Sequence, residues 1–348
     1  MNSLAKTKQA WSRLGYGMFI HFGVNTFAGT GWGDGTFPAE AFRPEGAAPE
    51  QWADVAAKAG MKYAVLTAKH HDGFCLWPSK HTGYSVKASG VPDLVRSFAG
   101  AFRARGLKVG LYYSLWDRNC ACYEDDAKYA DYMKFQLEEL LTGYGDILEL
   151  WFDGGWDKDS PAKDWSREPA PDEEPDGRRW FWKELYAHIH RIQPECLVIQ
   201  NSSSNRPGRV RYLPADVRTS EHYHFIFEEK ECVPPADGIV IDPDSGEPLE
   251  LPIEFCTTLT PDWFWKAGAC YSHPSAACIA DWRLQAARMG GNLLLNIGPD
   301  AKGRIPACHQ PFLTEARELF EKNAPEAIRP QAHAAASSEN PLTQRNRL

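Results

Sequence analysis

The chain has 348 residues, of which 43% are hydrophobic and 24% are charged, and its formal net charge is −8 at pH 7. This composition is typical of a globular chain that buries a large core. Nucleic-acid binding requires clustered Lys and Arg, and no basic run is present. No stretch approaches the roughly 20 apolar residues of a membrane span. We therefore expect neither a nucleic acid nor a membrane among its partners.

The cysteines and the N-terminus bear on the cellular compartment. The nine cysteines are odd in number and scattered, and the closest pair, Cys120 and Cys122, lacks the spacing of a structural zinc site. Free thiols in a reducing compartment are the simplest interpretation. Residues 1–11 are polar and carry no apolar signal core. We expect a cytoplasmic protein.

In chain order, short apolar runs rich in β-favouring residues alternate with segments that have a helical pattern. The expected strands cover residues 17–23, 63–69, 108–114, 146–153, 196–201, 217–221, 253–258 and 291–298. The expected helices cover residues 49–59, 92–105, 125–142, 178–192, 274–289 and 310–322. A polar insertion over 157–177 is typical of a surface loop, and the turn signals in 234–252 predict a hairpin or a long loop.

Eight strands with helices between them predict a (β/α)8 TIM-like barrel rather than a doubly wound sheet. No Gly-x-Gly-x-x-Gly motif follows any strand, which argues against a dinucleotide-binding fold. We expect one catalytic barrel over residues 1–325 and a frayed or disordered tail over 326–348.

The stretch 146–155 contains the most informative strand end. Alternation places Glu149, Trp151 and Asp153 on one face, and Asp153 is followed by two glycines. Alone, such a carboxylate is most simply a cap or a connector residue. The strand ends of a barrel share one rim, however, where active sites lie. The polar residues at the expected ends are His21, residues 69–72, residues 112–118, Asp153, Asn201 and Glu221.

Two chemistries suit this rim. Metal-dependent hydrolysis would use His21, His70, His71 and Asp153 as ligands, whereas glycoside hydrolysis needs two carboxyl groups and side chains that hold sugar hydroxyls. Adjacent strand residues point to opposite faces, so His70 and His71 bind one ion only if the strand has already ended. Tryptophans at expected loop positions favour a sugar; they are Trp32, Trp77, Trp116, Trp263 and Trp265.

Five segments resemble the α-L-fucosidases of glycoside hydrolase family 29; they are residues 18–23, 64–80, 110–114, 151–154 and 292–299, with Lys-His-His-Asp-Gly-Phe at 69–74 as the most specific block. The resemblance implies a retaining, exo-acting enzyme that needs no metal or other cofactor and acts on a fucosylated oligosaccharide or glycoside. It places the nucleophile on Asp153. It also places fucose-binding residues on His21, His70, His71 and Tyr112.

The resemblance leaves two positions for the acid/base. Residues 219–221 resemble the family's Thr-Pro-Glu segment, and residues 253–257 resemble its Trp-Glu-x-Cys-Thr segment. Glu221 is preferred and Glu254 is the alternative. A general acid needs a pKa raised towards neutrality, which burial beside Asp153 would supply.

The chain departs from the family in two places. Trp32 to Gly35 resembles a Glu-Trp-Gly-Asp-Gly segment of the regiospecific branch, yet Gly31 replaces the Glu, so the fucose contact is missing or is supplied by Asp34. Trp116 opens a Trp-Asp-Arg-Asn segment that resembles the same branch, which cleaves α-1,3 and α-1,4 linkages. Many relatives continue into a C-terminal β-sandwich, and we expect the barrel alone here.

The remaining candidates have equally simple structural explanations. Trp263 and Trp265 form either an aromatic wall for the sugar or part of the core. Arg206 and Arg209 either reach a fucose hydroxyl or lie on the surface. Two other functions stay open: a metal-dependent barrel hydrolase, and a fucose-binding protein without activity, against which the retained Asp153 argues.

Overall fold

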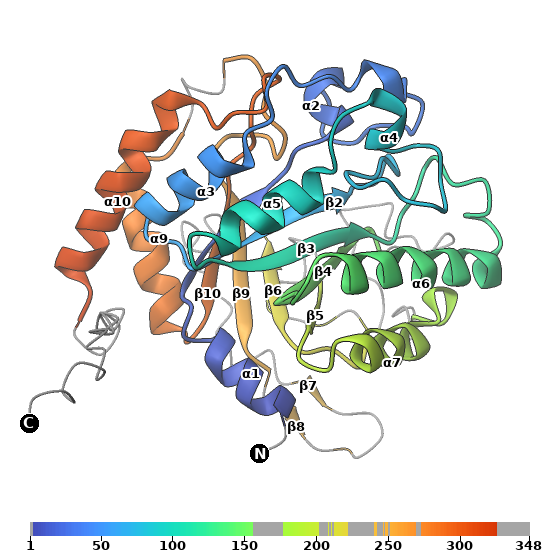
Figure 1. The fold of residues 1–348 in the computed structure, drawn as a ribbon. Coiled ribbons are helices and arrows are strands. Elements are labelled where there is room, and N and C mark those ends of the chain that lie inside the picture. Colours follow the sequence, from blue (N-terminus) through green and yellow to red (C-terminus); the bar gives the residue numbers. More distant parts are fainter. Residues whose placement is uncertain are drawn as a thin grey trace, which may run out of the picture.

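The computed structural model describes residues 3–155, 177–201, 208, 210, 212–221, 240–241, 246, 248–249, 251–268 and 273–325. Parallel strands form one sheet in the order β5-β4-β3-β2-β1-β10-β9-β6, and a parallel bridge joins Ile199 to Val217 beside the two end strands. The sheet curls into a nearly closed barrel, which confirms the predicted (β/α)8 fold (Figure 1). Its strands are β1 (Tyr16–Ile20), β2 (Tyr63–Lys69), β3 (Lys108–Ser114), β4 (Glu149–Asp153), β5 (Leu197–Gln200), β6 (Arg218–Glu221), β9 (Ile253–Thr258) and β10 (Asn292–Asn296).

The predicted helices are present on the outside of the barrel. They are α3 (Pro49–Lys58), α5 (Leu94–Arg103), α6 (Asp126–Gly143), α7 (Trp182–Ile192), α9 (Ala276–Arg288) and α10 (Gln310–Asn323). Side-chain caps set several of their starts, because an oxygen there satisfies a backbone N–H that has no partner in the first turn. Asp93 accepts from the N–H of Arg96 in this way, and Asp125 accepts from Lys128.

Shorter helices occur within the loops. They are α2 (Val24–Ala28), η1 (Ala39–Ala41), α4 (Val86–Ser89), η4 (Arg178–Trp180) and η7 (Ala307–His309). The sequence pattern predicts none of them as a separate element, because each is too short to show a helical period. The turn signals in 234–252 correspond to an antiparallel pair, β7 (Val240–Ile241) and β8 (Pro248–Leu249).

Helix α1 (Ser3–Trp11) is also missing from the prediction, and tertiary contacts fix it. It lies below the barrel, beside the amino-terminal ends of the strands (Figure 1). The indole of Trp11 is buried and donates to Oε2 of Glu149 at 2.5 Å, while Asn292 donates to the Trp11 carbonyl at 2.9 Å. The helix has no strong apolar stripe, so one anchoring side chain rather than periodicity determines where it sits.

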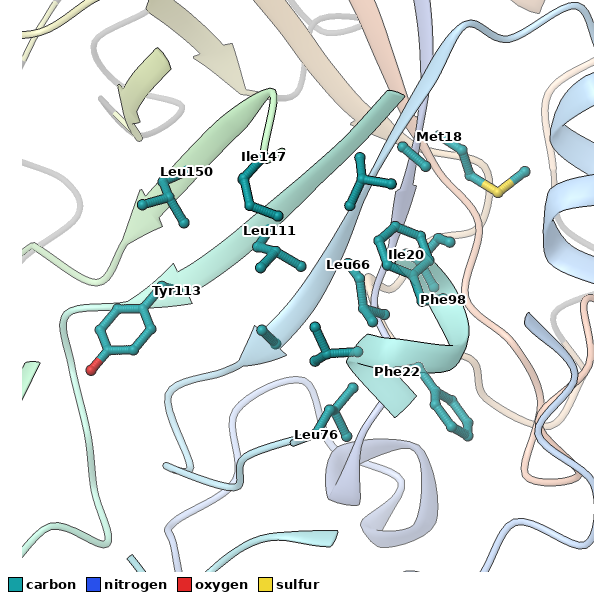
Figure 2. Close-up of a cluster of buried hydrophobic side chains, with 14 of the residues drawn as sticks. Met18, Ile20, Phe22, Leu66, Leu76, Phe98, Leu111, Tyr113, Ile147 and Leu150 are labelled. Carbon is teal, nitrogen blue, oxygen red and sulfur yellow. The ribbon is translucent and has the colours of Figure 1, made fainter. Parts of the chain in front are cut away.

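The outward faces of the strands make the main core. Met18, Ile20, Leu66 and Leu111 point away from the barrel axis towards the helices, where Phe98 of α5 covers them (Figure 2). Apolar area removed from water in this way contributes roughly 25 cal/mol per Å². The strands are buried on both faces, as a parallel sheet requires.

The inward faces form a second core that narrows around large side chains. It contains Phe19, Tyr63, Val65, Tyr112, Trp151, Leu197, Ile199, Val217, Cys256 and Leu294, closed by Trp11. Glycines make room for two of the bulkier groups. A Cβ on Gly17 would lie 2.5 Å from the Tyr63 ring, and a Cβ on Gly110 would lie 2.8 Å from Cγ of Glu149. The barrel interior is therefore packed, and a site can open only at the strand ends.

Three further expectations concern the cysteines, the C-terminal tail and the polar insertion. Cys75, Cys120, Cys122, Cys196, Cys256 and Cys278 are free thiols. The expectation of free thiols is wrong at Cys308, which is disulfide-bonded. The tail at 326–348 and nearly all of the insertion at 157–177 lie outside the described residues.

Among the described residues, no helix combines the length and the apolar character that crossing a bilayer requires.

Candidate active site

Asp153 is the last residue of β4, and its carboxylate accepts three hydrogen bonds. The Tyr112 hydroxyl donates to Oδ2 at 2.8 Å, Asn201 donates to Oδ1 at 3.1 Å, and the N–H of Gly154 donates to Oδ1 at 2.7 Å. Gly154 has a φ of 68°, and a Cβ there would lie 2.9 Å from Cβ of Trp116. Glycine at this turn lets the neighbouring loop approach the carboxylate closely.

Glu221 is the last residue of β6 and meets Asp153 through a shared partner. The same nitrogen of Asn201 donates to Oε2 of Glu221 at 2.7 Å. Burial and the charge of Asp153 raise the pKa of Glu221 to about 7, and the Asn201 hydrogen bond opposes that rise. The site therefore holds two linked carboxyl groups, one of which keeps a proton near neutral pH.

Glu254 lies elsewhere. It is the second residue of β9, and the register pairs Glu221 with Cys256, so Glu254 lies two residues, or about 6.6 Å along the strand, below Glu221. Trp151 donates to its Oε1 at 3.0 Å, and the Tyr63 hydroxyl donates to Oε2. Burial also raises its pKa to about 7. The structure brings Glu221, and not Glu254, into one hydrogen-bonded group with Asp153.

His21, which directly follows β1, presents a defined nitrogen to the site. Its Nδ1 lies 2.8 Å from Oδ1 of Asn296, whose amide nitrogen donates to the Trp263 carbonyl at 2.7 Å and to Thr258 at 3.0 Å. The amide orientation makes His21 Nδ1 the donor and leaves Nε2 as an acceptor. Burial lowers the pKa of His21 to about 3, so the ring is neutral at neutral pH.

His71 is held in the same tautomer. Its Nδ1 lies 2.7 Å from the hydroxyl of Ser114, and that hydroxyl donates to the Trp116 carbonyl at 2.6 Å. Nδ1 therefore donates, and Nε2, which is 3.6 Å from Oδ2 of Asp153, is the acceptor. Burial lowers the pKa of His71 to about 4, although the charge of Asp153 opposes this shift.

His70 has the opposite tautomer. Asn25 Nδ2 lies 3.3 Å from its Nδ1 and also donates to Asp72 at 2.9 Å, so Nδ1 accepts and Nε2 carries the proton. Burial and the neighbouring imidazoles hold its pKa well below the ordinary range. Because β2 ends at Lys69, His70 and His71 both turn towards the site, with ring centroids 4.1 Å apart.

Aromatic rings pack against these imidazoles. The His70 ring stacks on Tyr112 at 5.4 Å, and Trp263 lies 5.0 Å from His21. The ring that contacts both histidines edge-on is Phe264, at 4.9 Å from His70 and 5.3 Å from His21. Trp265 is partly buried, and among the described residues it forms no ring pair with a histidine. The prediction named Trp263 and Trp265 for an aromatic wall, whereas the rings that pack against the histidines are those of Trp263 and Phe264.

The other rim candidates are placed as follows. Trp32 is 45% exposed and lies with its ring 5.6 Å from His71, on the outer side of the site beside Trp116. Asp34 is exposed and accepts from the backbone and hydroxyl of Thr36 at 2.9 Å and 2.6 Å, which makes it part of a local turn. It does not join the group around Asp153. Arg206 and Arg209 lie outside the described residues.

The assembled groups suit an uncharged ligand with several hydroxyls and an apolar face. His21 and His71 offer acceptor nitrogens, His70 offers a donor, and the rings of Phe264 and Trp263 offer an apolar surface. A few placed polar groups among aromatic side chains are the usual features of a small-molecule site. Within the described part of the chain, no three His, Cys, Asp or Glu side chains are arranged to hold a metal ion.

The comparison with known families fits this chemistry. The model of the α-L-fucosidase family matches residues 36–324, which is more than half of the chain. The chain belongs to the α-L-fucosidase family. The family resemblance seen in the sequence is therefore confirmed, and the family model covers the barrel from residue 36 to residue 324.

Individual members of the α-L-fucosidase family give the same result. α-L-Fucosidase 1 of Arabidopsis thaliana is 31% identical over 316 residues, which cover 89% of this chain and 58% of that protein. A solved α-L-fucosidase isoenzyme 1 from Paenibacillus thiaminolyticus is 30% identical, with a TM-score of 0.67 over 92% of this chain and 77% of the other. A putative α-L-fucosidase of Bacteroides ovatus has a TM-score of 0.72 at 29% identity, over 91% and 55% of the two chains. The chain spans about half the length of the curated relatives that it matches.

Several residues of the candidate site were given no role by the sequence. Asn201 and Ser114 were placed on the rim but given no role, and Asn25, Asn296 and Phe264 were not singled out. Asn296 was detectable in principle, because alternation in Asn-Leu-Leu-Leu-Asn puts it on the inward face at a strand end. The others act from loops or through a neighbour, where a single sequence carries no periodic signal.

Proposed function

We propose that the protein is a retaining exo-α-L-fucosidase with Asp153 as nucleophile and Glu221 as acid and then base. The shared donor of Asn201 supports this proposal. Its nitrogen lies 3.1 Å from the accepting oxygen of Asp153 and 2.7 Å from that of Glu221. The distance between these two carboxyl oxygens therefore cannot exceed the sum of the two hydrogen-bond lengths. Retaining glycosidases separate their carboxyl groups by about 5–5.5 Å, whereas inverting enzymes need about 6.5 Å or more.

The steps follow from the two carboxyl groups. An Oδ of Asp153 bonds to the anomeric carbon while Glu221 gives its proton to the glycosidic oxygen, and the aglycone leaves as an alcohol. Glu221, now a carboxylate, takes a proton from water. That water attacks the fucosyl-enzyme, and Asp153 departs as a carboxylate. The pKa of about 7 places a proton on Glu221 when the first step needs it.

The substrate class follows from the neutral pocket. A fucose residue carries three hydroxyls for the nitrogens of His21, His70 and His71, and its methyl group suits the Phe264 ring. A fucosylated oligosaccharide or glycoside is therefore the proposed substrate. Trp32 and Trp116 lie beside His71 on the outer side of the site, where they would meet neighbouring sugars of a branched glycan. We include a preference for α-1,3 and α-1,4 linkages in the proposal.

One experiment tests the reaction and its stereochemistry. The protein is incubated with an aryl α-L-fucoside and with α-1,3- and α-1,4-fucosylated oligosaccharides, and NMR follows the first anomer of fucose released. We expect the α-anomer from the wild type and no turnover by Asp153→Asn, which keeps the shape but not the nucleophile. Early release of the β-anomer would refute retention. Absence of release from every substrate, together with measurable fucose binding, would identify a binding protein instead.

A further inference from the structure

Glu254 is joined to Asp153 by a continuous series of side-chain contacts through the barrel. Trp151 donates to Oε1 of Glu254 at 3.0 Å, and its indole stacks on the Tyr112 ring with centroids 5.7 Å apart at 17°. The hydroxyl of Tyr112 donates to Asp153 at 2.8 Å. The Tyr112 ring also stacks on His70, with centroids 5.4 Å apart and an angle of 12° between the rings. Asp153 and His70 thus both contact Tyr112, whose ring stacks on Trp151.

We propose that Glu254 is a positioning residue: from the floor of the barrel it fixes the Trp151 indole, and Trp151 supports the Tyr112 hydroxyl on Asp153. This inference rests on the proposed function for its activity readout. The described hydrogen bonds of the Glu254 carboxyl go to Trp151 and Tyr63 and not to Asp153, so it acts through Trp151. The contact series runs across three strands, from β9 through β4 to β3.

The indole needs such a partner because it is nearly sealed from water. Trp151 is 2% exposed, and its ring also packs on Phe19 at 5.1 Å. Its only polar atom is Nε1, and a buried N–H without an acceptor is strongly disfavoured. The Glu254 carboxyl thereby selects the ring orientation in which the indole lies parallel to Tyr112. An apolar residue at 254 would remove that selection while leaving the strand in place.

The floor around Glu254 contains a second acid and no described basic partner. Burial and the charge of Glu254 raise the pKa of Glu149, which accepts from the Trp11 indole, while Tyr63 donates to Glu254. Both glutamates are completely buried, and burial shifts both towards the protonated form. A protonated Glu254 still accepts from Trp151. Glutamine is therefore its closest neutral mimic.

Three variants separate positioning from acid/base catalysis. Glu254→Leu removes the acceptor, Glu254→Gln keeps it, and Trp151→Phe keeps a ring but removes the N–H. We measure kcat/KM on aryl α-L-fucosides with good and poor leaving groups, with and without azide, beside Glu221→Gln as the acid/base reference. Glu254→Leu and Trp151→Phe should each lose about 10- to 100-fold, the cost of roughly 1 Å of misplacement, equally on both substrates and without azide rescue. Glu254→Gln should stay within a few-fold of wild type.

The double variant Glu254→Leu/Trp151→Phe should lose no more than the worse single variant, because both changes break one contact. Multiplied losses, unchanged Glu254→Leu activity, or a loss confined to poor leaving groups with azide rescue would overturn the proposal. If Glu254→Leu does not fold, Trp151→Phe and Glu254→Gln still give opposite expected results.

Crystal structures give a readout that needs no activity. The Tyr112–Asp153 distance should stay near 2.8 Å in Glu254→Gln and lengthen in Trp151→Phe. An unchanged distance in Trp151→Phe overturns positioning even if the wild type releases no fucose. The latter result would refute the proposed function separately.

Discussion

Asn201→Ala is the change that tests the linked carboxyl groups most directly. The variant removes one nitrogen that donates to both Asp153 and Glu221. Hydrogen bonds to charged groups contribute about 1.5–3 kcal/mol, so losing this donor should lower kcat/KM roughly 10- to 150-fold at about 1.4 kcal/mol per factor of ten. The same bond opposes the rise in the pKa of Glu221, so its loss should move that pKa above about 7.

The higher pKa of Glu221 in Asn201→Ala predicts the direction in which the pH profile of activity moves. If Glu221 must be protonated for the first step, activity falls as the pH rises through its pKa, and the alkaline limb of the variant should lie at higher pH than that of the wild type. The assay is kcat/KM for an aryl α-L-fucoside between pH 4 and 9. Gln193→Ala is the matched control, because that amide bonds the Leu141 and Gly145 carbonyls below the barrel. An unmoved or lowered alkaline limb in Asn201→Ala would refute the coupling.

Three further changes have defined outcomes. Tyr112→Phe removes the donor to Asp153 Oδ2 and should lower kcat about 10- to 100-fold, with wild-type thermal stability as the control; unchanged kcat would contradict the role given to that bond. Gly154→Ala should destabilise the fold and reduce activity together, because φ is 68° and the added Cβ meets Trp116 at 2.9 Å, which thermal unfolding and kcat/KM measure. Between the ordinary pKa of 4.5 and about 7, Glu254 keeps its proton in the folded wild type and has lost it in the unfolded chain, so the wild-type free energy of unfolding falls as the pH rises through that window. Glu254→Gln cannot titrate at this position and lacks that fall. The urea midpoint of the variant, relative to that of the wild type, should therefore increase from pH 5 to pH 8.

The periodic part of the fold was predictable from the sequence, and the parts fixed by single contacts were not. Strand alternation correctly put Glu149, Trp151 and Asp153 on one face, which the structure turns inward, because alternation is a property of the extended chain itself. Helix α1 was missed since it is fixed by Trp11 binding Glu149, a residue 138 positions away. No local pattern carries that information.

The candidate site divides in the same way. Strand ends located Asp153, His21 and Glu221, because a barrel brings every carboxyl end to one rim. The resemblance also suggested Asp34 as a fucose contact, yet its carboxylate accepts two hydrogen bonds from Thr36 within a local turn. Phe264, which lies between Trp263 and Trp265 in the sequence, was not predicted as a site residue. Which of three adjacent aromatic residues faces the histidines depends on the loop path, which composition does not determine.

Burial of the rim has opposite effects on its acids and bases, and both effects remove charge. It raises the pKa of Glu221 to about 7 and lowers the pKa of His21 and His71 to about 3 and 4. Charged histidines would pair with Asp153 and compete with the sugar, whereas neutral ones offer directional acceptors to hydroxyls. The hydrogen bonds of Tyr112 and Asn201 hold the carboxylate in place. In the proposed mechanism, removal of water from the rim thus keeps a proton on Glu221 and keeps Asp153 from pairing with charged histidines, as an uncharged substrate requires.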